Sequence, residues 1–223
     1  MIQYIDLGLI HYNDAWKYQE KHFDEMVNAK KLGQTPQKQF LLVCEHPHVY
    51  TLGKSGSEQN LLINTLQLQA KNATFVKTNR GGDITYHGPG QIVGYPILDL
   101  EQLKMGIRDY IYYLEEVIIQ TLQSYSIKSE RYEGARGVWI DTDDPAATRK
   151  ICSIGVRSTR YITMHGFALN VNTDLSYFSY INPCGFTDKK MTSMAKELQV
   201  SEIDINSVKE TFRDVFMRYF QIS

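Results

Sequence analysis

The amino-acid sequence predicts an α/β protein, with α+β character, in which helices flank a mixed β-sheet. Short apolar runs bounded by turn residues predict buried strands, and longer stretches with apolar residues at helical spacing predict amphipathic helices. The two kinds of element interleave without the strict alternation of a βαβ series, so a purely parallel sheet is not expected. No linker-like run of Pro, Ser or Gly divides the 223 residues, and we therefore expect one domain over residues 1–223.

Three long helices are predicted from apolar periodicity. The first is expected to start at a cap formed by Asp14 and to stop at Gly33, with an inward face of Trp16, Gln19, Phe23, Met26 and Val27. The second has the clearest amphipathic pattern of the chain: Ile107, Ile111, Leu114, Val117, Ile118 and Leu122. The third closes the chain with Val208, Phe212, Val215, Phe216 and Phe220. A short helix is also expected within residues 58–71.

Strands are predicted at residues 40–44, 49–52, 74–77 and 92–98, and then near 149–157, 160–164 and 166–171. The acidic, turn-rich segment at 141–145 is expected to be an exposed loop.

Composition excludes several classes of protein. The net charge of −1 argues against a broad nucleic-acid-binding surface. There is no apolar run long enough to span a bilayer, and the N-terminal residues lack the layout of a signal peptide. Three cysteines, an odd number, do not make a disulfide framework. We therefore expect a protein of the reducing cytoplasm, without nucleic-acid or membrane partners.

Residues 80–91, RGGDITYHGPGQ, form the most unusual stretch of the sequence. Four glycines and a proline surround a cation, a carboxylate, a phenol, an imidazole and an amide, and a long apolar strand follows directly. Polar glycine-rich loops at a strand end commonly carry binding or catalysis. The alternative is two tight turns joined by a short strand.

Two further residues have chemistry suited to acyl transfer. Cys184 lies between Pro183 and Gly185, where a turn can leave its sulfur accessible to substrate. Lys150 lies in a predicted strand, and partial burial would lower the pKa of its amine so that it could exchange protons near neutrality. The alternatives are a small buried cysteine and a solvated lysine. His87 and His165 are the histidines best placed to bond to a substrate or to tune such a pair, although each could equally have a local structural partner.

Five segments of the chain resemble the octanoyltransferases of lipoate biosynthesis, also called lipoyl(octanoyl) transferases. They occur in the order of that family, at 45–53 (EHPHVYTLG), 80–91, 150–157 (KICSIGVR), 165–170 (HGFALN) and 181–185 (INPCG). The resemblance implies the fold of biotin and lipoate protein ligases. It also implies that Lys150 and Cys184 form a catalytic dyad that carries the acyl group as a cysteine thioester.

The resemblance further implies the partners and the binding residues. The donor would be octanoyl-acyl carrier protein, and the acceptors would be lipoyl domains of 2-oxoacid dehydrogenase complexes and the glycine cleavage H protein. Neither ATP, a cofactor nor a metal would be needed. The substrate-binding residues would be Arg80, Gly81, Gly82, Thr85, Tyr86, His87, Gly88, Ser153, Ile154, Gly155, His165, Gly166 and Ala168. Backbone N–H groups near Gly81, Gly82 or Gly155 are candidates to hold the tetrahedral oxyanion.

One position departs from the pattern of the family, in which alanine is usual at the position of Cys152. Residues two apart in a strand share a face, so Cys152 is expected to point the same way as Lys150. It is therefore a second candidate thiol, although the turn around Cys184 favours that residue.

Two other motifs do not qualify as sites. Residues 53–55 resemble the end of a phosphate-binding loop, but the required preceding glycine is replaced by His48. Cys44, His46 and His48 alternate like metal ligands, but Pro47 interrupts them and no second ligand pair has zinc spacing. The competing functions are an ATP-dependent lipoate-protein ligase on the same fold and a non-catalytic module that binds lipoyl domains or carrier protein.

Overall fold

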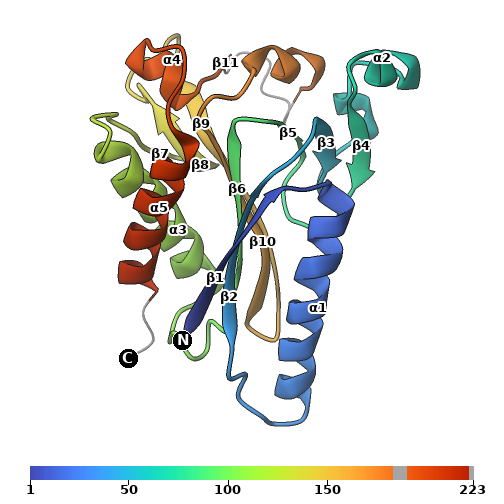
Figure 1. Cartoon of the computed structure of the whole chain (residues 1–223), viewed down its shortest axis with the longest axis vertical. Coiled ribbons are helices and arrows are strands. Elements are labelled where there is room, and N and C mark those ends of the chain that lie inside the picture. Colours follow the sequence, from blue (N-terminus) through green and yellow to red (C-terminus); the bar gives the residue numbers. More distant parts are fainter. Residues whose placement is uncertain (183–189, 221–223) are drawn as a thin grey trace.

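The computed structural model describes residues 1–182 and 190–220, and Cys184 therefore lies outside the described residues (Figure 1). Within them, a large mixed sheet has the strand order β1-β2-β6-β10-β9-β8-β7, with β11 paired to β9. Its strands are β1 (Ile2–Leu9), β2 (Gln39–Glu45), β6 (Gln91–Ile97), β7 (Glu130–Tyr132), β8 (Ala135–Ile140), β9 (Arg149–Thr159), β10 (Ile162–Asn170) and β11 (Lys190–Met191). The pairs β1–β2 and β11–β9 are parallel and the others are antiparallel, which confirms the predicted mixed sheet.

A second, three-stranded sheet has the order β4-β3-β5. It consists of β3 (Val49–Leu52), β4 (Thr74–Lys77) and β5 (Ile84–His87). Three short helices accompany it, namely the 3₁₀-helices η1 (Glu58–Asn60) and η2 (Leu175–Tyr180) and the α-helix α2 (Thr65–Ala70). An apolar cluster that includes Tyr50, Ile84, Tyr86 and Phe178 joins this sheet to η2.

Helices cover both faces of the large sheet (Figure 1). On one face lies α1 (Tyr12–Lys31), whose Phe23, Met26 and Val27 pack with Leu42, Val93 and other residues of the central strands. On the other face lie α3 (Ile107–Gln123) and α5 (Ile205–Tyr219), whose apolar stripes join residues such as Ile151 and Leu169 in the largest core cluster. The short helix α4 (Met194–Leu198) precedes α5. No helix among the described residues is both long and apolar enough to cross a membrane.

Two predicted boundaries were wrong. Helix α1 begins at Tyr12, and His11 rather than Asp14 is its N-cap residue; Asp14 instead lies in the first turn. The separate strands expected at 160–164 and 166–171 are one strand, β10, which passes through His165 at a left-handed φ of 59°. Pro96 of the neighbouring strand β6 has no N–H to donate where it faces β10, and a proline inside a sheet accompanies such local irregularities.

Candidate active site

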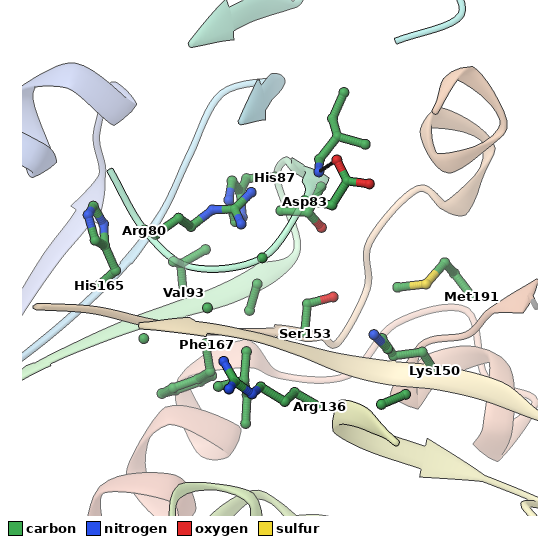
Figure 2. Close-up of a pocket in the computed structure, with 18 of the residues that line it drawn as sticks. Arg80, Asp83, His87, Val93, Arg136, Lys150, Ser153, His165, Phe167 and Met191 are labelled. Carbon is green, nitrogen blue, oxygen red and sulfur yellow. Dashed lines mark hydrogen bonds between the residues drawn. The ribbon is translucent and has the colours of Figure 1, made fainter. Parts of the chain in front are cut away.

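A cavity of about 360 Å³ is lined by residues of both sheets, of α1 and of η2. Most of the predicted site residues line it: Arg80, Gly82, Thr85, His87, Lys150, Ser153, Ile154, Gly155, His165, Gly166 and Ala168. Figure 2 shows Lys150 and Met191 at one end, Ser153 and Phe167 in the middle, and Arg80 and His165 towards the other end. Apolar residues such as Val93, Ile154 and Phe167 thus share the wall with charged ones such as Asp83 and Arg136, and a concave site of this kind suits a ligand with both apolar and polar parts.

Three predicted residues lie behind the cavity wall. The Tyr86 side chain is fully buried, and its hydroxyl bonds to Nδ1 of His48 at 2.7 Å. A Cβ atom at Gly88 would overlap that hydroxyl, so only glycine fits there. The backbone N–H of Gly81 donates to the carbonyl of Val156 at 3.0 Å and is therefore not available to an oxyanion. Of the candidate donors, Gly82 and Gly155 remain in the wall.

A directed chain of hydrogen bonds runs beneath the glycine-rich loop. The guanidinium of Arg80 donates to Thr51, and His87 bonds to Thr51 Oγ1 through Nε2 and to Gln91 Oε1 through Nδ1, at 3.2 and 2.8 Å. The Gln91 amide nitrogen donates to Asn170 Oδ1, which identifies Oε1 as the atom that faces His87. His87 therefore carries its proton on Nδ1 and uses both ring nitrogens within the protein.

Burial sets the charge of the two site histidines. It lowers the pKa of His87 well below the ordinary value, with His46 and Arg80 as smaller causes. It lowers the pKa of His165 to about 3, with smaller contributions from Arg80 and Arg157. Both rings are therefore neutral at physiological pH.

The two histidines differ in the bonds that they leave open. His165 Nε2 bonds to Asn79 Oδ1 at 2.6 Å, and its backbone N–H donates to Gln19 Oε1. Its Nδ1 has no hydrogen-bond partner among the described residues. Of the two predicted pocket histidines, His165 is thus the one that retains a nitrogen for a further bond.

Lys150 reaches the cavity because of an irregularity in β9. Val138 of β8 pairs with Cys152, whereas the next residue, Trp139, pairs with Lys150. Strand β9 thus has one more residue than β8 over this stretch, which interrupts the alternation of faces. Lys150 lines the cavity, while Ile151 and Cys152 both lie in the core cluster on the other side.

The expectation that Cys152 shares a face with Lys150 was therefore wrong. Its side chain is completely buried, and burial raises the pKa of its thiol well above the ordinary value. A protonated thiol without access to the cavity is a poor nucleophile. The arrangement agrees with a packing role in place of alanine.

Cys44 at the end of β2 and the following His46 and His48 do not form a metal site, although Cys44 Sγ lies 3.5 Å from His46 Nε2. His46 bonds to the Ile10 carbonyl and the Tyr95 hydroxyl, both at 2.7 Å, and burial lowers its pKa to about 4. His48 instead contacts Tyr86 of the second sheet. Among residues 1–182 and 190–220, no group of three or more His, Cys, Asp or Glu side chains is placed to hold a metal.

Several cavity residues were not identified from the sequence, among them Tyr12, Tyr95, Trp139, Phe167, Phe178 and Met191. Val93 and Tyr95 share a face of a strand that was predicted, but the whole strand is buried, so its pattern did not distinguish the face that lines the cavity. Trp139 lies in β8, which was not predicted.

Comparison with known sequences identifies the family to which this fold and cavity belong. Residues 11–217 match the model of the lipoyl protein ligase A/B catalytic domain, and the chain belongs to this family. It is 54% identical to an octanoyltransferase of Parabacteroides distasonis, over 98% of each chain. It is 53% identical to an octanoyltransferase of Christiangramia forsetii, over 97% of this chain and 94% of the other. These relatives assign it to the octanoyltransferase group within the family, as its motifs predicted.

Solved structures confirm the predicted ligase-like fold. A bipartite lipoate protein ligase of Thermoplasma acidophilum aligns with a TM-score of 0.73 and 15% identity, over 100% of this chain and 85% of the other. A lipoate-protein ligase A bound with ATP aligns with a TM-score of 0.69 and 14% identity, over 100% of this chain and 85% of the other. At such identities the likeness concerns the fold alone.

Proposed function

We propose that residues 1–223 act as a single catalytic domain that transfers an octanoyl group from octanoyl-acyl carrier protein to a lysine of a lipoyl domain. The acyl group passes through a thioester on Cys184, with Lys150 as the proton carrier. The names of the relatives, octanoyltransferase at more than 50% identity, support the transfer. The acceptors are the lipoyl domains of 2-oxoacid dehydrogenase complexes and the glycine cleavage H protein.

One observation carries the assignment of the dyad. Lys150 lines the cavity and pairs with Met191, just beyond the segment 183–189 that contains Cys184. On the other side of that segment, the N–H of Asn182 donates to the Asn60 carbonyl, and the Asn60 amide donates to Asp83 in the cavity wall. One described flank of the cysteine segment thus lines the cavity that holds Lys150, and the other is tied to the cavity wall by hydrogen bonds.

In the first half-reaction, the neutral amine of Lys150 takes the proton of the Cys184 thiol. The thiolate attacks the carbonyl carbon of the carrier thioester, and the C–S bond to the carrier breaks. Lys150 returns the proton to the departing carrier thiolate. One thioester replaces another, so the step needs no ATP.

In the second half-reaction, the lysine amine of the lipoyl domain attacks the acyl-cysteine. Lys150 accepts the proton that this amine loses, and then protonates the Cys184 thiolate as it leaves. The product is an amide and the enzyme is regenerated. Lys150 is therefore needed twice, as a base and as an acid.

The walls of the cavity suit an uncharged acyl chain. Val93, Ile154 and Phe167 offer apolar surface, while His87 and His165 are neutral. The buried guanidinium of Arg80 donates hydrogen bonds to the Thr51 carbonyl and the Gly81 carbonyl, so these N–H groups are held by the protein backbone. A reducing cytoplasm would keep the Cys184 thiol available.

Mass spectrometry tests the proposal directly. The protein is mixed with octanoyl carrier protein alone, without ATP and with EDTA present. We expect one octanoyl adduct on the peptide with Cys184, removable by hydroxylamine and chased onto a lipoyl domain, and no adduct on Cys184→Ala. Strict dependence on ATP and free octanoate, without an adduct, would identify a ligase instead. Binding of both proteins without transfer would identify a non-catalytic module.

A further inference from the structure

The amine of Lys150 lies over an aromatic ring. Its Nζ atom is 4.4 Å from the centroid of the Trp139 ring, within the range of a cation–π interaction. Trp139 is 2% exposed, and its indole N–H donates to the Ala135 carbonyl at 3.2 Å. The ring is therefore fixed by the protein before any substrate arrives, and one of its faces meets the lysine.

The sheet brings these two residues together at the irregularity of β9. Trp139 is the cross-strand partner of Lys150, immediately after the point where β9 has its extra residue. Gly137 makes this pairing possible, because its φ is 110° and a Cβ atom there would overlap the Cys152 carbonyl. The Gly137 N–H donates to Glu115 Oε1 of α3 at 2.9 Å, which holds the strand from behind.

We propose that Trp139 is a positioning residue for the transfer reaction, whose ring face holds the ammonium form of Lys150 at the end of the cavity that Met191 lines. This inference rests on the proposed function. Lys150 becomes an ammonium twice in each cycle, and each time it must return its proton to a sulfur.

An aromatic face is suited to this task. It attracts the ammonium through its quadrupole. The ring does not take up the transferred proton, and it makes only weak contacts with the ammonium N–H groups. A carboxylate in the same place would hold the charge more tightly and would oppose return of the proton. The ring therefore orients the amine and leaves its N–H groups for the reacting atoms.

Fluorination of the ring tests the idea without changing its packing greatly. The chain has two tryptophans, so Trp16→Phe leaves Trp139 as the only site of labelling. In that background, 5-fluoro-, difluoro- and trifluorotryptophan withdraw electron density stepwise. We expect the single-turnover rate of acyl-cysteine formation to fall with each fluorine, by roughly tenfold over the series, with little change in carrier-protein affinity. Equal rates across the series would overturn the inference.

Two substitutions and one spectrum complete the test. Trp139→Phe should retain most of the rate and Trp139→Leu should lose more; if the leucine variant does not fold, the fluorinated series decides. The Lys150 methylene signals should be shifted upfield by the ring in NMR spectra, unlike those of the exposed Lys54, and unshifted signals would contradict the contact.

Absence of any acyl-cysteine in the unfluorinated Trp16→Phe protein, with the NMR shift present, would refute the proposed function and leave the contact established. A flat series with full acylation would refute only the role of Trp139.

Discussion

Arg80 and His87 meet at the hydroxyl of one threonine. Arg80 Nη2 lies 3.0 Å and His87 Nε2 lies 3.2 Å from Thr51 Oγ1. The guanidinium can only donate, so the hydroxyl accepts from Arg80 and gives its own proton to His87. The Thr51 hydroxyl thus links the charged Arg80 of the glycine-rich loop to the neutral His87 of β5 by hydrogen bonds.

Thr51→Val should therefore be more harmful than its shape suggests. Valine has nearly the volume of threonine but leaves His87 Nε2 and one N–H of Arg80 without their partner in a fully buried place. We expect a loss of about 2 kcal/mol in the free energy of unfolding, the usual scale for an unsatisfied buried polar group. Thr51→Ser keeps the hydroxyl and serves as the control in urea denaturation. Equal stability of the valine variant and the wild type would show that the chain of bonds contributes little.

Acidification should destabilise the fold through its buried imidazoles. His46, His87 and His165 have lowered pKa values in the folded state, so the unfolded chain binds more protons once the pH falls below about 6.5. Their stabilisation is complete above that pH and is lost progressively towards pH 4 and below. At pH 5 each of these histidines should lower the free energy of unfolding by up to about 2 kcal/mol.

Urea denaturation at pH 7 and at pH 5 measures this loss. NMR titration of the imidazoles gives an independent check, because none of the three should become protonated while the protein stays folded above pH 5. A folded protein with equal stability at both pH values would contradict the assigned neutral states.

Gly137→Ala should disturb both the fold and the site. The φ of 110° and the overlap of a Cβ atom with the Cys152 carbonyl leave no room for alanine. Gly33→Ala is the matched control: its φ is 72°, but nothing lies within 4 Å of its Cβ position. The control should lose about 1 kcal/mol from backbone strain alone, and Gly137→Ala should lose clearly more. Similar melting temperatures of the two variants would show that β8 can adjust.

Cys152→Ala should keep most of the activity. The side chain is buried in the core and does not line the cavity, so the change removes one small apolar group and costs about 1 kcal/mol of stability. Alkylation of the folded protein by iodoacetamide should spare Cys152. An inactive Cys152→Ala variant, together with turnover by Cys184→Ala, would mean that the reacting sulfur was assigned wrongly.

Local patterns predicted many of the elements. The apolar stripe from Ile107 to Leu122 corresponds to α3, and the strands at 49–52 and 74–77 have the observed boundaries. These features depend on periodicity and β propensity within one segment. The N-terminal strand β1 was missed because it is a half-exposed edge strand, whose pattern of buried and exposed residues is irregular.

The features that position the site depend on neighbouring strands. The directions of the Lys150 and Cys152 side chains follow from one extra residue in β9 relative to β8. That pairing cannot be predicted from the sequence of one segment alone. The left-handed φ of His165 likewise arises where β10 faces Pro96. The family motifs therefore pointed to many of the residues that line the cavity, but not to how these residues face each other.

The central claim is that Lys150 moves protons in both half-reactions, and Lys150→Arg tests it. Arginine keeps the positive charge but stays protonated at any working pH. We expect a folded variant whose single-turnover rates fall about 100-fold or more, both for acylation of Cys184 and for transfer from a pre-formed acyl-enzyme to the lipoyl domain. A folded Lys150→Arg protein with near-normal rates in both steps would contradict the claim and reduce Lys150 to a fixed charge.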